Sequence, residues 1–208
     1  ATAILAAACR DHHCFFIHFS TDYVYAPTAN LPLAETDPVL PTGVYGASKR
    51  AGELAAHWYN PASLIIRTSW VYSEFGNNFL KTMLRLGSTR EEINVVYDQV
   101  GSPTYAPDLA EAVLHIIQEQ EAGAFGKNML SGVFNYSHEG VCSWYDFALA
   151  IFEYSNVPCR VKPIRSRAFK TAAMRPPYSV LDKSKIKNTF HIEIPYWHNG
   201  LEKCLKNL

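Results

Sequence analysis

Four short apolar runs have the length and composition of buried β-strands. The first, Cys14 to Phe19, is rich in aromatic residues and apolar at successive positions, so both of its faces are expected to be covered. Such a run favours a parallel sheet with helices on both sides. The others are residues 63–66, 93–97 and 133–136.

Between these runs, apolar residues recur at helical spacing and the ends carry recognisable signals. A helix from about Val44 to Trp58 is expected to stop before Asn60-Pro61, since proline disfavours a helical conformation in the preceding residue. Asn77 or Asn78 can cap another helix, which Gly87 closes, and a capping-box pattern opens a third. Helices are predicted at residues 1–10, 44–58, 79–87, from 107–108 onward, from 143–146 onward and near 201–205.

Strands and helices therefore alternate through most of the chain, which is the signature of a parallel α/β sheet. The basic segment from Arg160 to Lys170 is interrupted by Pro163 and is predicted to be a loop. The opening Ala1 to Cys9 is helical in composition but has no start signal before it. We therefore expect the chain to begin inside a helix of something longer.

Composition narrows the class of protein. The formal net charge is zero, which gives no electrostatic footprint for nucleic acid or for an anionic membrane. No apolar run reaches transmembrane length, and no signal peptide is visible. The five cysteines are odd in number and show no CxxC spacing, so we expect reduced thiols in a cytoplasmic protein and no zinc site.

The first candidate for chemistry is the pair Tyr45 and Lys49. Residues four apart share one face of a helix, so the phenol and the ammonium group would point the same way. The cation would favour phenolate and lower the pKa of the tyrosine, which could then exchange a proton with a carbonyl or hydroxyl group. The alternative is an ordinary exposed helical pair.

Two further candidates follow predicted strands. Ser20, Thr21 and Asp22 come directly after the first strand, where parallel sheets bind ligands and where a hydroxyl can polarise a substrate oxygen. The alternative is a strand-end turn. Arg67 to Trp70 follows the second strand, and its tryptophan could form the wall of a sugar pocket or be a core aromatic.

Taken together, these stretches resemble the extended short-chain dehydrogenase/reductase family, and within it the dTDP-4-dehydrorhamnose reductases. The resemblance follows the chain in order over nearly its whole length. The segments that carry it are FIHFSTDYVY, VYGASKRAGE, IIRTSWVYSEFGNNFLKTML, VVYDQVGSPTYAPDLAEAV, GVFNYSHEGVCSWYDFALAIF and RPPYSVLDKSKI.

The resemblance implies roles for individual residues. Thr21, Tyr45 and Lys49 match the catalytic hydroxyl, the proton donor and its partner. The cofactor, NADPH or NADH, would be held by Ser20, Tyr45, Lys49, Thr68 and Ser69. The substrate, a dTDP-linked 4-keto sugar, would be held by Thr21, Asp22, Trp70, Asn78 and Gln99.

The chain departs from the family pattern in three places. Tyr25-Ala26-Pro27 stands where the family usually has Phe-Asp-Gly. The family resemblance also allows Mg²⁺ at the interface of a homodimer, but no residue is assigned as a ligand; Pro107 lies in the neighbourhood where such a ligand would fall. None of the 11 glycines forms the glycine-rich turn that receives the dinucleotide pyrophosphate. We therefore expect that three strands with their helices, roughly 80 residues, are missing, and that the chain alone binds cofactor weakly.

The expected architecture is the C-terminal part of a Rossmann-type doubly wound parallel sheet with a small α/β substrate lobe. Residues 1–70 and 106–137 would form the incomplete cofactor domain, and residues 71–105 and 138–208 the substrate lobe. The expected activity is NAD(P)H-dependent reduction of a dTDP-linked 4-keto sugar to dTDP-L-rhamnose, for surface polysaccharide. Two alternatives stay open: a non-catalytic relative of the type of the methionine adenosyltransferase regulatory subunit, and another sugar-nucleotide epimerase or reductase.

Overall fold

A three-stranded parallel sheet forms the larger part of the molecule. The structure, a computed structural model, describes residues 1–27, 30–124, 131–169 and 175–208. The sheet has the order β1-β2-β7, made of β1 (Ile17–Thr21), β2 (Leu64–Thr68) and β7 (Gly132–Tyr136). Its strands are paired in parallel along their full length.

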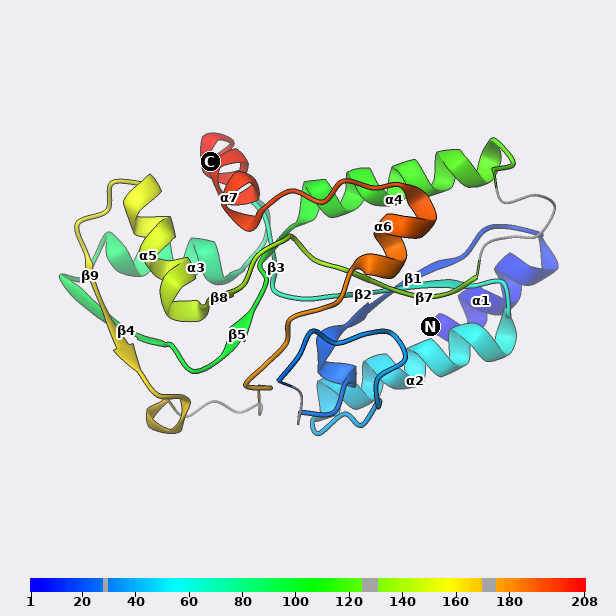
Figure 1. Ribbon diagram of the computed structural model, residues 1–208, viewed down its shortest axis with the longest axis horizontal. Helices are drawn as coiled ribbons and strands as arrows, with labels where there is room; N and C mark the ends of the chain where they lie inside the picture. The colour runs from blue at the N-terminus through cyan, green and yellow to red at the C-terminus, as the bar shows by residue number, and fades with distance from the viewer. Residues whose placement is uncertain (28–29, 125–130, 170–174) are drawn as a thin grey trace.

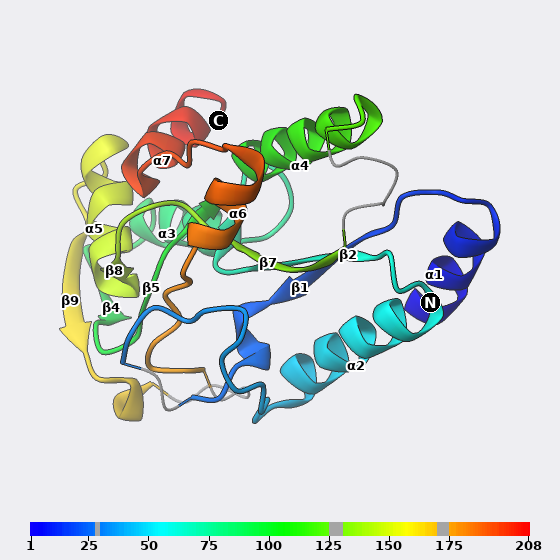
Figure 2. The same cartoon turned by 45° about the vertical axis from the view of Figure 1, so that its right-hand side comes forward.

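Helices cover both faces of this sheet. Figure 1 shows α1 (Thr2–Asp11) and α2 (Val44–Tyr59) on one face, and α4 (Ala106–Glu121) and α6 (Ser184–Phe190) on the other. Figure 2 shows the same layers from a second direction. The inner side chains of β2 and β7 pack against α4 and α6 in one apolar core, which includes Leu64, Ile66, Leu109, Ile116, Phe134 and Ile186. The covered sheet agrees with the predicted parallel α/β class.

A second lobe lies beside the sheet, at the left of Figure 1. Its strands β4 (Glu92–Val96) and β9 (Arg160–Ile164) pair in parallel, and α3 (Phe79–Gly87) and α5 (Trp144–Tyr154) pack on them. The helix α7 (Trp197–Lys206) contributes Trp197 and Leu201 to the same core. Short strand pairs connect the lobe to the sheet: β3 (Val71–Tyr72) with β6 (Thr104–Tyr105), and β5 (Val100–Gly101) with β8 (Cys142–Ser143).

The predicted helix signals are confirmed. Asn78 is the N-cap of α3 and accepts a hydrogen bond from the Lys81 amide. Ser143 and Asp146 form both bonds of the capping box of α5. The helix α3 ends at Gly87, as predicted.

Two predictions for strands are wrong. The segment Arg160–Ile164 is not a loop but the strand β9. Pro163 is tolerated there because the described β9 pairs only with β4 and lies at an edge, where a missing N–H breaks no second ladder. The first strand also begins later than predicted, at Ile17, and Phe19 is exposed, so its two faces are not equally covered.

Candidate functional site

The candidate hydroxyls lie at the carboxyl ends of two neighbouring strands. Thr21 is the last residue of β1 and pairs in register with Thr68, the last residue of β2. The sequence placed both residues after their strands, whereas the structure extends each strand to include them. Ser20, Thr21 and Thr68 are nevertheless gathered at one edge of the sheet, as the motif positions predicted, and all three are buried.

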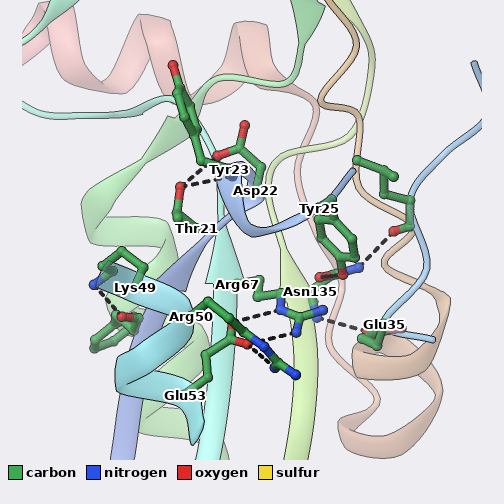
Figure 3. Close-up of polar contacts among 12 residues, drawn as sticks. Thr21, Asp22, Tyr23, Tyr25, Glu35, Lys49, Arg50, Glu53, Arg67 and Asn135 are labelled. Carbon is green, nitrogen blue, oxygen red and sulfur yellow. Dashed lines mark hydrogen bonds and ion pairs between the residues drawn. The ribbon is translucent and has the colours of Figure 1, made fainter. Parts of the chain in front are cut away.

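Thr21 is joined to Asp22 inside the protein. The Thr21 hydroxyl donates a hydrogen bond to Asp22 Oδ1 at 2.9 Å, and Thr21 Oγ1 accepts one from the Tyr23 amide at 3.3 Å (Figure 3). Thr21 is 5% exposed and Asp22 is 3% exposed. Burial raises the pKa of Asp22 to about 7, although the hydrogen bond from Thr21 and nearby backbone groups oppose the shift.

The helix α2 brings Tyr45 and Lys49 to the same strand end. Lys49 Nζ donates to the Phe19 carbonyl of β1 at 2.6 Å, two residues before Thr21. The Tyr45 ring packs edge-on against the ring of Tyr23, two residues after Thr21, with 5.6 Å between the ring centroids. Tyr45 remains 54% exposed and can therefore reach a ligand. The two residues thus contact the chain two positions before and two positions after Thr21.

The approach of α2 to the strand end depends on a glycine. A Cβ at Gly46 would clash with the Tyr23 carbonyl oxygen and lie about 3.0 Å from the Pro41 side chain. Only the absence of a side chain lets the first turn of α2 touch the turn Asp22–Val24 that follows β1. Gly46 therefore allows the close approach of α2 to the turn that follows Thr21.

A buried ion pair fixes α2 to the sheet, and the sequence reasoning missed it. Glu53, one helical turn after Lys49, binds Arg67 of β2 through two contacts of 2.8 Å, and Arg50 adds a third at 2.8 Å (Figure 3). Burial alone would raise the pKa of Glu53, but hydrogen bonds from Arg67 and Arg50 hold it below its ordinary value. The available signal was a charged Arg67 inside an otherwise apolar strand.

The network continues to the next strand. The Arg67 guanidinium lies over the Tyr25 ring, 4.7 Å from its centroid, and the Tyr25 hydroxyl donates to Asn135 Oδ1 of β7 at 2.8 Å. Glu35 Oε1 accepts a hydrogen bond from the backbone N–H of Asn135 at 2.8 Å. Tyr25, the departure from the family pattern, therefore ties the loop after β1 to the sheet.

Trp70 and Gln99 belong to a separate, neighbouring groove. Trp70 has a left-handed backbone, with φ of 49°, and its ring stacks on Trp144 with 3.5 Å between centroids and an angle of 8°. Arg175 lies over the Trp144 ring at 5.4 Å. Trp70, Gln99, Trp144 and Arg175 line a groove of about 1300 Å³ between α3, β4 and the segment after β9. Trp70 is thus not a fully buried core aromatic: its ring stacks on Trp144 and forms part of the wall of this groove.

The remaining predicted residues have structural partners. Ser69 donates from Oγ to the Ser102 carbonyl at 3.1 Å and is buried. Asn78 caps α3 and donates from Nδ2 to the Ser73 and Phe75 carbonyls. Asn78 is not among the groove-lining residues. Its predicted substrate contact stays a prediction, and its side chain is already used in the cap.

No group of three or more His, Cys, Asp or Glu side chains in the described ranges could hold a metal ion. No helix in those same ranges is long and apolar enough to cross a membrane. A second hollow of about 590 Å³, beside α4 and α7, contains none of the predicted site residues.

Comparison with known proteins gives a consistent result. The family model described as RmlD substrate binding domain matches residues 1–208. The chain is 40% identical to dTDP-4-dehydrorhamnose reductase of Burkholderia thailandensis, over 100% of this chain and 72% of the relative. It is 38% identical to the Escherichia coli reductase, over 98% of this chain and 69% of the relative.

Solved structures agree. The Bacillus anthracis dTDP-4-dehydrorhamnose reductase in complex with NADP superimposes with a TM-score of 0.91 at 37% identity, covering 100% of this chain and 70% of that one. The Bacillus cereus UDP-glucuronic acid 4-epimerase, at 22% identity and a TM-score of 0.75, shares the fold alone.

Proposed function

The chain belongs to the RmlD family of dTDP-4-dehydrorhamnose reductases, and on that premise we propose that it reduces dTDP-4-dehydro-L-rhamnose to dTDP-L-rhamnose with NADPH as hydride donor. Its fold would be a Rossmann-type doubly wound parallel sheet that carries a small substrate lobe. Residues 1–70 and 106–137 would bind cofactor, and residues 71–105 and 138–208 the sugar nucleotide. The proposal favours NADPH because the related Bacillus anthracis reductase was solved with NADP.

One observation carries this assignment of the site. Lys49 bonds the Phe19 carbonyl and Tyr45 packs on Tyr23, two residues before and two residues after Thr21, which supports a shared site at this strand end. Ligands of parallel α/β sheets bind at that end. Tyr45 is the exposed member of the three, as a proton donor to a bound ketone must be.

The residues divide the work as follows. NADPH, when bound, supplies the hydride that reduces the carbonyl carbon. Tyr45 gives its proton to the resulting alkoxide oxygen. Lys49, which donates one hydrogen bond to the Phe19 carbonyl, would have its remaining protons available to bind the nicotinamide ribose and the tyrosine. Thr21 would orient the ketone oxygen, and Ser20, Thr68 and Ser69 would contact the cofactor.

The groove is the proposed place of the sugar nucleotide. Trp70 and Trp144 offer a flat aromatic surface for a base or a sugar ring, and Arg175 lies at its edge. Guanidinium groups bind phosphate oxygens through paired donors, which suits a nucleoside diphosphate. Gln99 can donate and accept hydrogen bonds from the same wall. Asp22 is proposed to lie next to the substrate ketone.

Steady-state kinetics on the full chain that the gene encodes would test the proposal. NADPH oxidation should depend on dTDP-4-dehydro-L-rhamnose, with much slower reaction of a UDP-linked 4-keto sugar. Tyr45→Phe should lower kcat by about 10²–10⁴-fold with a smaller effect on substrate affinity. The exposed Tyr59→Phe at the end of α2 is a matched control and should react normally. An unchanged kcat in Tyr45→Phe would remove Tyr45 from the mechanism.

A further inference from the structure

The only proton of the Thr21 hydroxyl is directed into the protein. It is donated to Asp22 Oδ1 at 2.9 Å, between two side chains that are at least 95% buried. A hydroxyl group has one donor and two acceptor positions. One of the acceptor positions takes the Tyr23 amide. What Thr21 can present to a substrate is therefore a lone pair, as long as Asp22 accepts its proton.

A lone pair is the wrong group to place against a ketone. Hydride transfer puts negative charge on the ketone oxygen, and that charge is stabilised by hydrogen-bond donors. An ionised carboxylate can only accept, whereas a protonated carboxyl can donate one hydrogen bond. If Asp22 is protonated, it can donate to Thr21 Oγ1, and the threonine proton is then free for the ketone.

We propose that Asp22 is a positioning residue that sets the donor direction of the Thr21 hydroxyl, and that the protonated carboxyl is the form that supports reduction. This inference rests on the proposed function and deepens it. No covalent bond is made or broken at Asp22. Its proton stays on the carboxyl group and is donated in the hydrogen bond to Thr21, while Tyr45 supplies the proton that ends on the product.

The surroundings of Asp22 favour the protonated form near neutral pH. In the described ranges no lysine or arginine pairs with its carboxylate, in contrast to Glu53 and Asp108. The groups that face it are Tyr23 on its own turn and Ser179 from the segment before α6. Beyond Tyr23, Tyr45 of α2 and Arg175 complete the charged and titratable environment. Burial dominates and raises the pKa of Asp22 to about 7.

Asp22→Asn gives a sharp test, because an amide donates permanently to Thr21 and does not titrate. For the full chain we expect wild-type kcat to fall about tenfold per pH unit above pH 7, the slope for loss of one proton. Asp22→Asn should remain flat through that range and equal or exceed wild type at pH 8. If kcat of Asp22→Asn also falls above pH 7, or is reduced equally at every pH, the proposal is overturned.

Substitutions of Thr21 separate a positioning role from a structural one. Thr21→Ser keeps the hydroxyl, so its kcat should still fall above pH 7. Thr21→Val removes the hydroxyl, so kcat should drop and the remaining activity should no longer depend on Asp22 ionisation. If kcat of Thr21→Val still falls above pH 7, Asp22 does not act through Thr21 and the inference is contradicted.

A second readout does not need turnover. Infrared difference spectra of wild type against Asp22→Asn should show a protonated-carboxyl band that disappears as pH rises through about 7. Absence of this band at pH 6 would refute the inference even in an active enzyme. If the band titrates but no ketone is reduced at any pH, the proposed reductase function fails and the protonation of Asp22 stands.

Discussion

Removing the Glu53 carboxylate should destabilise the protein more than any surface substitution on α2. Glu53 binds Arg67 through two contacts of 2.8 Å, and the side chains of the pair are only 1% and 2% exposed. Glu53→Gln keeps the shape of the side chain but leaves the Arg67 charge buried without a counter-charge. Arg67 is fixed in β2 between neighbours and cannot turn out to solvent.

The magnitude follows from this burial. Breaking a buried ion pair by removing one partner costs about 3–5 kcal/mol, since the remaining charge is not solvated. Arg50, which contacts the same carboxylate, is 33% exposed, so Arg50→Gln should cost no more than about 1 kcal/mol. Replacing both Glu53 and Arg67 with Met and Leu should cost less than either single change, because no buried charge is left.

Urea unfolding, followed by tryptophan fluorescence and by circular dichroism, measures these differences. With a slope of about 2 kcal/mol per M urea, a loss of about 4 kcal/mol lowers the midpoint by about 2 M. Arg50→Gln serves as the matched control on the same helix. If Glu53→Gln lowers the urea midpoint no more than Arg50→Gln does, the ion pair between Glu53 and Arg67 is effectively solvated, and the expected cost of breaking it is wrong.

The pair also predicts a pH dependence with a definite sign. The folded pKa of Glu53 lies below its ordinary value of 4.5, so its contribution to stability is fully present above that value. It is lost as the pH falls through the folded pKa. Wild-type stability should therefore decline below about pH 4.5 more steeply than that of Glu53→Gln. Parallel curves for the two proteins would contradict the argument.

Three further predictions concern single positions. Gly46→Ala should cost about 1–3 kcal/mol, because the new methyl group meets the Tyr23 carbonyl, and should lower kcat by displacing Tyr45; thermal unfolding and kinetics check it. Asn78→Ala should cost about 1 kcal/mol through loss of the α3 cap with an unchanged KM for the sugar nucleotide, whereas a raised KM would show substrate contact. Asp22 has its pKa raised from 3.8 to about 7, so the stability that it contributes is full below pH 3.8 and is lost as pH rises through 7; relative to Asp22→Asn, wild type should lose about 4 kcal/mol in urea unfolding over that range.

Local sequence patterns determined most of the elements of this protein. Helix starts such as the Asn78 cap and the Ser143–Asp146 capping box depend on bonds within a few residues, so their residue types were enough to find them. The alternation of strands and helices indicated the parallel α/β class for the same reason. The motif positions at the ends of β1 and β2 followed from that class, because parallel strands end at one edge.

Tertiary structure decided what those positions do. The strand Arg160–Ile164 forms because β4 pairs with it. Its five residues mix charged, apolar and proline side chains, and this pattern does not indicate a pairing partner. The ion pair between Glu53 and Arg67 joins residues 14 positions apart on different elements. Nothing in the sequence distinguishes these two charges from surface charges, and only the fold buries both. Thr21 was visible in the sequence as a hydroxyl at a strand end. The direction of its proton depends on Asp22, and burial, which only the packed fold creates, decides whether that carboxyl is charged.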